Sequence, residues 1–385
     1  MRATTAPLVE APPLVAPATI AVTRPTLPPF EEYVALLEGI WERNHLTNAG
    51  PLVLELERQL ARYLGVRHCL FVSNGTIALQ LAFRALELSG EVITSPFSYV
   101  ATTSSIAWEG CVPVFADVEP DTLTLSVERA AAAITDRTSA IVATHVYGNP
   151  CDVEGIEALA RERGLRVVYD AAHAFGAMYR GRALSTYGAT STLSFHATKL
   201  FHTVEGGAVV TDDDEIARRV ASLRNFGHDG YERFQGIGIN GKNSEVHAAM
   251  GLCLLPRVTQ IIAERRSLSQ EYDKRLLGRH DVVRPTVRAG TEYNHAYYPV
   301  LLAGDAAVRA VQRDLESHGV LARRYFYPSL SGALPYVATG DVPVARDASE
   351  RVLCLPLYTG LRPEDVHRVA DLLTESLDGF ARGRS

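Results

Sequence analysis

Short apolar runs alternate with amphipathic segments along most of this chain. Residues 30–43 place Tyr33, Leu36, Leu37 and Ile40 on one face of a helix. The apolar runs that follow are mostly separated by a helical stretch or by a turn with Gly or Pro. We expect buried strands at residues 69–72, 91–94, 112–116, 140–145, 165–170, 190–195 and 208–211.

Buried strands that alternate with helices are typical of a mostly parallel sheet with helices on both faces. The pattern therefore predicts an α/β fold. Ligands of such sheets bind beyond the carboxyl ends of the strands. The residues with candidate chemistry follow those ends in this sequence.

The pattern changes near residue 243, where a long helical tract begins at 245–277. A strand at 296–302 and helices at 305–318 and 363–377 follow that tract. This order of elements predicts a second, smaller α+β domain.

We therefore divide the chain into three parts. Residues 1–29 hold seven prolines and few charges, so we expect a non-helical arm that is mobile or straps another surface. Residues 30–242 form the predicted large domain. Residues 243–385 form the predicted long helix and small C-terminal domain.

The composition narrows the classes of partner. The chain has 385 residues, 47% of them hydrophobic, which is enough to bury a large core. Its net charge of −6 is spread along the sequence without a basic stripe, so we expect no nucleic acid partner. No apolar run approaches the roughly 18 residues that cross a bilayer, and no secretory signal pattern opens the sequence. We therefore expect a cytoplasmic protein without a membrane partner.

The spacing of the cysteines argues against a metal site. They lie far apart, mostly in apolar strings, without CxxC spacing or a His-rich companion segment. We expect small buried side chains in a reducing compartment. The five residues are Cys69, Cys111, Cys151, Cys253 and Cys354.

Lysine is rare in this chain, which has Lys199, Lys242 and Lys274 against 35 arginines. A lysine offers what an arginine lacks, a primary amine that can lose its proton and form a Schiff base with a carbonyl. Lys199 follows the apolar run at 191–195, and the Ser194 hydroxyl is spaced to lie near the same point. This setting indicates pyridoxal phosphate (PLP) chemistry. A lysine that reaches from a strand end to solvent is the alternative.

Asp170 ends the expected strand at 165–170 and is followed by mostly small residues. A carboxylate at the mouth of a parallel sheet leaves room for a flat ligand, and with a pyridine ring it would keep the ring nitrogen protonated. The alternative is an Asp that caps the next helix. His173 is either a hydrogen-bond donor to the phenolic oxygen of such a ring or a structural histidine between strands.

The string Ser73-Asn74-Gly75-Thr76 follows the first expected strand and opens an apolar helix. Backbone N–H groups and the helix dipole converge at such a turn, so it can bind an anion, for which phosphate is the natural choice. An ordinary N-cap at Ser73 or Asn74 would leave the same string.

Two further segments carry candidate ligand contacts. Tyr99 follows the second expected strand, where an aromatic ring can stack on a cofactor. Phe97 is the competing choice, and core packing is the alternative for both. Asn240 follows Gly236 and Gly238 in a loop between the predicted domains, which is either an ordinary turn or a loop that reaches the site of a neighbouring subunit.

Together these segments resemble the DegT/DnrJ/StrS family of sugar aminotransferases, which have the aspartate aminotransferase (type I) PLP fold. The resemblance extends from about residue 23 to the C-terminus. It rests on residues 73–79, 96–102, 145–148, 170–176, 194–199, 205–208 and 240–252.

The resemblance implies roles for the residues around the cofactor ring. Lys199 matches the Schiff-base lysine, and Asp170 matches the partner of the pyridine nitrogen. His173 matches a position that touches the ring oxygen, and Tyr99 matches the stacking aromatic. One branch of the family carries histidine at the lysine position and performs dehydration, and Lys199 argues against that branch.

The resemblance also implies a phosphate site and a homodimer. Gly75 and Thr76 match the phosphate-binding turn, and Ser194 matches the phosphate-binding hydroxyl. Asn240 matches an asparagine that reaches the phosphate of the partner subunit. We therefore expect active sites shared between two subunits.

The implied reaction moves an amino group from L-glutamate to a ketone of a nucleotide-linked deoxysugar. Lys199 would act as general base and acid on the reacting face. Enzymes of the family that act at C4 tend to carry a His-x-x-Lys string followed by Glu-Gly-Gly, as His196, Lys199 and Glu205 do here. We therefore predict amination at C4 of a dTDP-linked 4-keto-6-deoxyhexose, which gives a 4-amino-4,6-dideoxy sugar.

Candidate residues for binding the substrate's diphosphate lie further along the chain, at 323–327. Arg323, Arg324, Tyr325 and Tyr327 could contact it, and a solvated surface pair is the alternative for the two arginines.

The sequence leaves other functions to compare with this one. A C3 aminotransferase of the same family and a PLP-binding regulatory or scaffold protein without turnover are the alternatives. A nucleotide-dependent oxidoreductase would require GxGxxG after the first strand, and the string at 73–76 lacks it.

Overall fold

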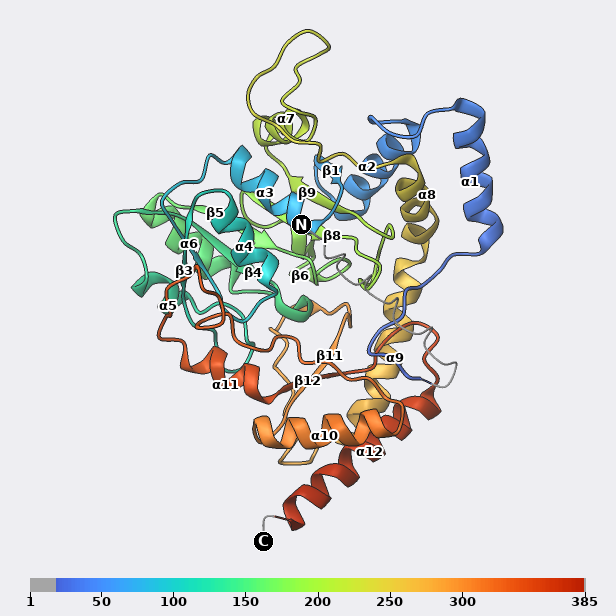
Figure 1. Ribbon diagram of the computed structural model, residues 1–385, viewed down its shortest axis with the longest axis vertical. Coiled ribbons are helices and arrows are strands. Elements are labelled where there is room, and N and C mark those ends of the chain that lie inside the picture. The colour runs from blue at the N-terminus through green and yellow to red at the C-terminus, as the bar shows by residue number, and fades with distance from the viewer. Residues whose placement is uncertain (1–18, 384–385) are drawn as a thin grey trace, which may run out of the picture.

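Helices cover both faces of a central sheet in the computed structural model, which describes residues 19–383 (Figure 1). The seven-stranded sheet within that range has the order β1-β9-β8-β5-β4-β2-β3. In this sheet β9 runs antiparallel to both neighbours, and the pairs among β8, β5, β4, β2 and β3 are parallel. The strands are β1 (His68–Val72), β2 (Glu91–Thr94), β3 (Val112–Phe115), β4 (Thr138–Thr144), β5 (Arg166–Asp170), β8 (Thr190–Ser194) and β9 (Gly207–Thr211). The prediction of a mostly parallel sheet is confirmed.

All seven expected strands are present, with bounds that differ from the expected ones by no more than one or two residues. Side chains in β1 alternate between two apolar layers: Cys69 and Phe71 join one buried cluster, and Leu70 and Val72 join the other. Because both faces of the sheet are covered, its strands appear in the sequence as nearly continuous apolar runs. The covering helices are α2 (Pro51–Leu64), α3 (Gly75–Ala85), α4 (Val100–Trp108), α5 (Val127–Ala132), α6 (Val153–Arg163), α7 (Asp214–Leu223) and α8 (Glu245–Leu254).

The helical tract expected at 245–277 is two helices, so the expectation of one continuous helix is wrong. A 3-10 turn at Leu255–Arg257 joins α8 to α9 (Val258–Leu276). Pro256 lies in this turn, and a proline has no N–H for a helical hydrogen bond and crowds the preceding turn.

Among the described residues, Glu245–Leu276 is the one helical stretch that contains an 18-residue segment apolar enough to cross a membrane, with a mean hydropathy of 1.4 in that segment. The sequence analysis did not identify this segment, because it expected no apolar run of nearly that length. Half of that 18-residue segment is buried inside the protein. Core helices of globular proteins commonly have this composition.

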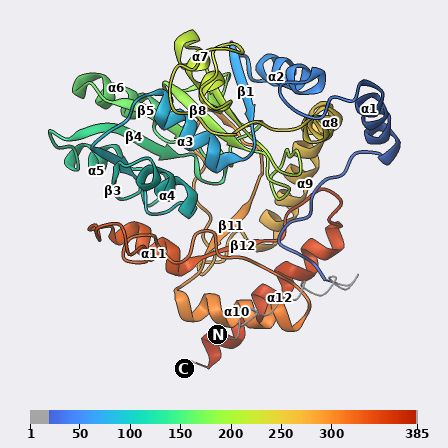
Figure 2. The same cartoon turned by 45° about the horizontal axis from the view of Figure 1, so that its top comes forward.

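A second, two-stranded sheet lies beneath the large one (Figure 2). Its strands pair antiparallel and share a buried cluster with α9 and the helices around them. The sequence analysis did not predict the helix and strand at 343–355. The elements of this part are β11 (Tyr298–Leu301), α10 (Asp305–Ser317), α11 (Pro343–Arg351), β12 (Val352–Leu355) and α12 (Pro363–Arg382).

Two smaller features complete the described chain. Helix α1 (Phe30–Arg43) has the bounds expected from the sequence. A small sheet of order β10-β6-β7 was not predicted. Its strands are β6 (Met178–Tyr179), β7 (Arg182–Ala183) and β10 (Thr291–Glu292).

The expected arm contacts the C-terminal part of the protein through residues 20–22 and the segment around Lys199 through Thr23 and Thr26. Ile20 exchanges backbone hydrogen bonds with Gly319 and Leu321 at 2.9 and 2.8 Å, and Val22 accepts one from Leu357 at 3.1 Å. Residues 1–18 of that arm lie outside the described range. The domain boundaries at 29 and 242 stay predictions.

Candidate active site

A cavity of about 540 Å³ lies beyond the carboxyl ends of the parallel strands. Residues that follow β1, β2, β5 and β8 line it together with residues from the C-terminal part. The residues with an expected role that line it are Gly75, Thr76, Tyr99, Asp170, His173, Ser194, Lys199, Arg323 and Tyr325. The structure therefore brings together most of the expected site.

Lys199 lies in the bend that follows β8. Its amine donates a hydrogen bond to the Tyr297 hydroxyl, 3.4 Å away. Burial lowers the pKa of this amine to about 8, and the charges of Asp170 and Tyr99 raise it in part. A large fraction of the amine is therefore neutral near pH 8, where it can act as a nucleophile or a base.

Asp170 ends β5 with its side chain buried. Its Oδ2 accepts a hydrogen bond from the Thr102 hydroxyl at 2.6 Å, and its Oδ1 accepts one from the Ala172 N–H at 3.1 Å. These two bonds fix the plane of a carboxylate that also lines the cavity. The chain continues from Asp170 to β6 without a helix, so Asp170 is not a helix cap.

His173 is buried, and its Nδ1 accepts a hydrogen bond from the Tyr147 N–H at 3.1 Å. The ring proton therefore sits on Nε2. Burial, helped by the charge of Lys199, holds the pKa of His173 well below its ordinary value. The ring stacks on Phe326 with centroids 5.6 Å apart. His173 is thus a neutral imidazole in a fixed orientation, with an N–H to donate.

The turn after β1 both caps a helix and lines the cavity, the two roles that the sequence of residues 73–76 allowed. Helix α3 begins at Gly75, and the Asn74 side chain caps it by accepting from the Ile77 N–H at 2.9 Å. The same turn lines the cavity. A Cβ at Gly75 would lie 2.9 Å from the Cβ of Ser194, so glycine lets β8 approach the helix N-terminus closely. The Ser194 side chain is thereby placed beside the turn.

Of the two aromatic residues after β2, Tyr99 lines the cavity and is 60% exposed. Phe97 is fully buried and packs edge-on against Tyr147 and Phe326. Tyr99 can therefore stack on a ligand in the cavity, and Phe97 cannot.

Asn240 does not line the cavity of its own chain. It lies in the loop that follows α7, which projects from the top of the protein in Figure 1. Its side-chain oxygen accepts a hydrogen bond from Lys242 at 2.9 Å. The structure of the single chain therefore does not bring Asn240 into the cavity, although its neighbour Gly241 accepts a hydrogen bond from the Ser73 N–H at 2.9 Å.

The four residues considered for the diphosphate separate into two pairs. Arg323 and Tyr325 line the cavity, and Arg323 has no carboxylate within ion-pair distance in the described part of the chain. Arg324 instead pairs with Asp305 at 2.7 Å. The Tyr327 hydroxyl accepts a hydrogen bond from Arg309, away from the cavity. The two adjacent arginines of this irregular segment therefore point in different directions.

The sequence analysis missed several side chains at the cavity. Tyr297 faces Lys199, and Thr102 reaches Asp170 from α4. Thr192 lines the cavity with a buried hydroxyl that has no hydrogen-bond partner among the described residues. Four of the five residues of β8 carry a hydroxyl, so no sequence pattern singled out Thr192.

Within residues 19–383, no group of three or more His, Cys, Asp or Glu side chains is placed to hold a metal ion. The five cysteines are buried and form no disulfides.

Comparison with known proteins places the chain in a family. A model of the DegT/DnrJ/EryC1/StrS aminotransferase family matches residues 30–374. A dTDP-4-amino-4,6-dideoxy-D-glucose transaminase from Shigella dysenteriae is 39% identical over 367 residues, covering 92% of this chain and 98% of that protein. A GDP-perosamine synthase from Caulobacter vibrioides is 34% identical over 341 residues, covering 86% and 92%.

Among solved structures, that of DesI in the presence of its TDP-sugar product has a TM-score of 0.90 at 36% identity, with 97% of each chain covered. This likeness confirms the fold class expected from the sequence. The chain belongs to the DegT/DnrJ/EryC1/StrS aminotransferase family.

Proposed function

We propose that this protein transfers an amino group from L-glutamate to the C4 ketone of a dTDP-linked 4-keto-6-deoxyhexose, with pyridoxal phosphate as cofactor. The product is a 4-amino-4,6-dideoxy sugar nucleotide. One observation carries the proposal: the amine of Lys199, whose pKa is lowered to about 8, and the buried carboxylate of Asp170 line one cavity. The similarity to a dTDP-4-amino-4,6-dideoxy-D-glucose transaminase supports the choice of nucleotide and carbon.

The residues of the cavity fit pyridoxal phosphate. The N-terminus of α3 at Gly75 and the neighbouring Ser194 hydroxyl suit a phosphate group. Asp170 suits a protonated ring nitrogen, and the Nε2–H of His173 suits the ring's phenolic oxygen. The unpartnered hydroxyl of Thr192 is a further polar atom that a bound ligand would satisfy.

When bound, pyridoxal phosphate supplies an electron sink for the carbon that loses its proton and carries the amino group between substrates. Lys199 supplies the proton transfers, because an amine with a pKa near 8 exists in both protonation states close to neutral pH. Asp170 holds the proton on the ring nitrogen, and its two hydrogen bonds keep the carboxylate in place.

The acceptor's nucleotide diphosphate needs a cation near the mouth of the cavity. Arg323 meets this need, because it lines the cavity without a carboxylate partner in the described range. Tyr325 lies beside it, with the Arg323 guanidinium 5.2 Å from the centre of its ring. Arg324 forms an ion pair with Asp305 and is therefore a weaker candidate for binding the diphosphate.

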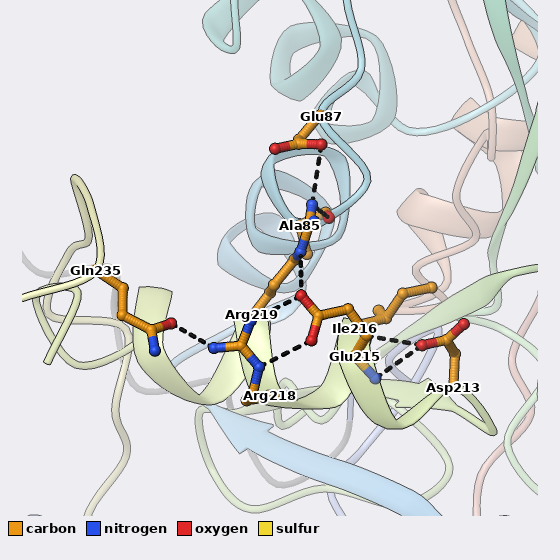
Figure 3. A network of polar contacts seen from close by, with 8 residues as sticks. All are labelled: Ala85, Glu87, Asp213, Glu215, Ile216, Arg218, Arg219 and Gln235. Carbon is orange, nitrogen blue, oxygen red and sulfur yellow. Dashed lines mark hydrogen bonds and ion pairs between the residues drawn. The ribbon is translucent and has the colours of Figure 1, made fainter. Parts of the chain in front are cut away.

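We infer that two subunits share their active sites through the loop that contains Asn240. The loop exposes large apolar side chains, among them Tyr231, Phe234 and Ile237, which a second copy of the chain could cover. It is tied to α7 because Arg218 donates to Gln235 while Glu215 binds Arg218 (Figure 3). These contacts support a loop that is already ordered within one subunit and that brings Asn240 to a partner subunit.

The experiment that tests the function supplies the 3-keto and 4-keto isomers of a dTDP-6-deoxyhexose separately, each with glutamate. The new C–N bond is then located by NMR. We expect product from the 4-keto isomer, with nitrogen on C4. A product aminated only at C3 would overturn the choice of carbon. A PLP-loaded protein that turns over no amino donor would instead favour a regulatory or scaffold role.

A further inference from the structure

Three buried hydroxyl groups lie in a row beside Asp170. Thr144 ends β4, Ser98 follows β2, and Thr102 lies in the first turn of α4. The Ser98 Oγ lies 3.1 Å from the Thr144 Oγ1 and 2.9 Å from the Thr102 Oγ1. The Thr102 Oγ1 lies 2.6 Å from the Asp170 Oδ2. Since β2, β4 and β5 are neighbours in the sheet, the row follows the carboxyl edge of three adjacent strands.

The carboxylate at the end of the row sets the direction of every bond in it. An ionised carboxylate only accepts hydrogen bonds, so Thr102 must donate its proton to Asp170. Thr102 then accepts from Ser98, and Ser98 accepts from Thr144. Hydroxyl groups aligned in this way polarise one another, which strengthens the last bond in the row.

We propose that Thr102, supported by Ser98 and Thr144, is a positioning residue that holds the Asp170 carboxylate toward the ring nitrogen of the cofactor. The proposal rests on the proposed function, because it assigns the row to the same cofactor site. Thr102 itself is fully buried and does not line the cavity. It therefore acts on a bound ligand through Asp170 alone.

The chain offers a matched control for this residue. Thr103 is the next residue of α4, is also fully buried, and its hydroxyl has no hydrogen-bond partner among the described residues. Thr102→Val and Thr103→Val replace the same type of side chain by one of nearly equal volume. Only the first change removes a hydrogen bond to Asp170.

The test follows the absorbance of the PLP-loaded enzyme against pH and measures the Kd of the cofactor. In Thr102→Val, a less firmly held carboxylate leaves the ring nitrogen less fully protonated. The ring then withdraws less charge from the nitrogen that joins the cofactor to Lys199. The proton affinity of that nitrogen therefore rises. We expect a higher midpoint pH of the absorbance change, a severalfold higher Kd and a kcat about tenfold lower.

Further variants keep the test decisive. Thr102→Ser keeps a hydroxyl and should return the midpoint toward the wild-type value. Ser98→Ala removes the donor to Thr102 and should shift the midpoint in the same direction by a smaller amount. Because Ser98 also lines the cavity, Thr102→Ala replaces Thr102→Val as the test if that variant does not fold. Thr103→Val should titrate like the wild type.

The proposal would be overturned if Thr102→Val, or Thr102→Ala in its place, had the same midpoint as the wild type. It would also be overturned if the Thr103→Val control shifted by the same amount. The readout does not depend on the sugar. A wild-type protein that binds the cofactor and aminates no nucleotide sugar would refute the proposed function and leave this comparison valid. A wild-type protein that binds no pyridoxal phosphate would overturn both.

Discussion

The hydroxyl of Tyr297 accepts a hydrogen bond from the amine of Lys199 across 3.4 Å. The two residues are 98 positions apart in the sequence, and Tyr297 immediately precedes β11. Burial raises the pKa of Tyr297, so its hydroxyl stays protonated at neutral pH. Tyr297 therefore orients the amine without competing with it for a proton.

Removing this hydroxyl should slow the chemical step. We expect Tyr297→Phe to lower kcat about threefold to tenfold, the effect of one neutral hydrogen bond. The KM for the nucleotide sugar should change little, because the ring is retained. Steady-state kinetics with both substrates measures this effect. An unchanged kcat would show that the contact does not orient the amine.

Burial of the Lys199 amine should appear in the stability of the apoprotein. Its pKa falls from 10.5 to about 8 on folding, so between these values the unfolded chain binds a proton that the folded chain does not. Stability from this group therefore rises with pH across that window. Below pH 8 both states are protonated, and the full cost of burying the charge, about 3 kcal/mol, is present.

Lys199→Met should therefore stabilise the apoprotein at pH 7 by up to about 3 kcal/mol, since Met has a similar shape without the charge. The advantage should shrink as the pH approaches 10.5. Urea unfolding of the two apoproteins at several pH values measures the difference. A difference that stays constant from pH 7 to pH 10 would contradict the desolvated amine.

Glu205 and His196 provide a test that separates binding from stability. The His196 Nε2 lies 3.6 Å from a Glu205 oxygen, and the side chains are 47% and 55% exposed. Such a pair contributes less than about 1 kcal/mol to stability. Both residues line the cavity, so they are placed to contact the sugar.

We expect Glu205→Gln to raise the KM for the sugar nucleotide several-fold without a measurable loss of unfolding free energy. Asp214→Asn removes a carboxylate that pairs with Arg67 and His68 outside the cavity lining, and it serves as the control. Equal KM values for the two variants would exclude Glu205 from substrate binding.

The sequence predicted the parts of the fold that depend on local pattern. The sheet is covered on both faces, so each strand leaves an apolar run, and the carboxyl ends of those runs identified Asp170 and Lys199. Pro256 was the local signal for the break between α8 and α9, and it was overlooked. The segment at 343–355 joins a short helix directly to a four-residue strand, which leaves little periodicity to detect.

Contacts between distant segments could not be predicted in the same way. Thr102 reaches Asp170 over 68 positions, and only the packing of α4 against the sheet edge brings them together. Likewise, adjacent arginines look alike in sequence, yet Arg323 lines the cavity and Arg324 pairs with Asp305. Backbone direction decides between them, and backbone direction in an irregular segment has no sequence pattern.

Sharing of active sites can be tested with mixed subunits. Lys199→Ala and Asn240→Ala chains should each be inactive or nearly so alone. A heterodimer of the two contains one site with both residues intact, so mixing should restore part of the activity. Purification of the heterodimer on two different tags controls for incomplete exchange. No recovery in proven heterodimers would refute sharing through Asn240.

The central claim is that Lys199 is the residue that holds and serves the cofactor, and the rarity of lysine makes this directly measurable. The PLP-loaded protein is reduced with borohydride, digested and mapped by mass spectrometry. With three lysines in the chain, the possible outcomes are few. We predict a pyridoxyl group on Lys199 in stoichiometric yield. A label on Lys242 or Lys274 would contradict the account.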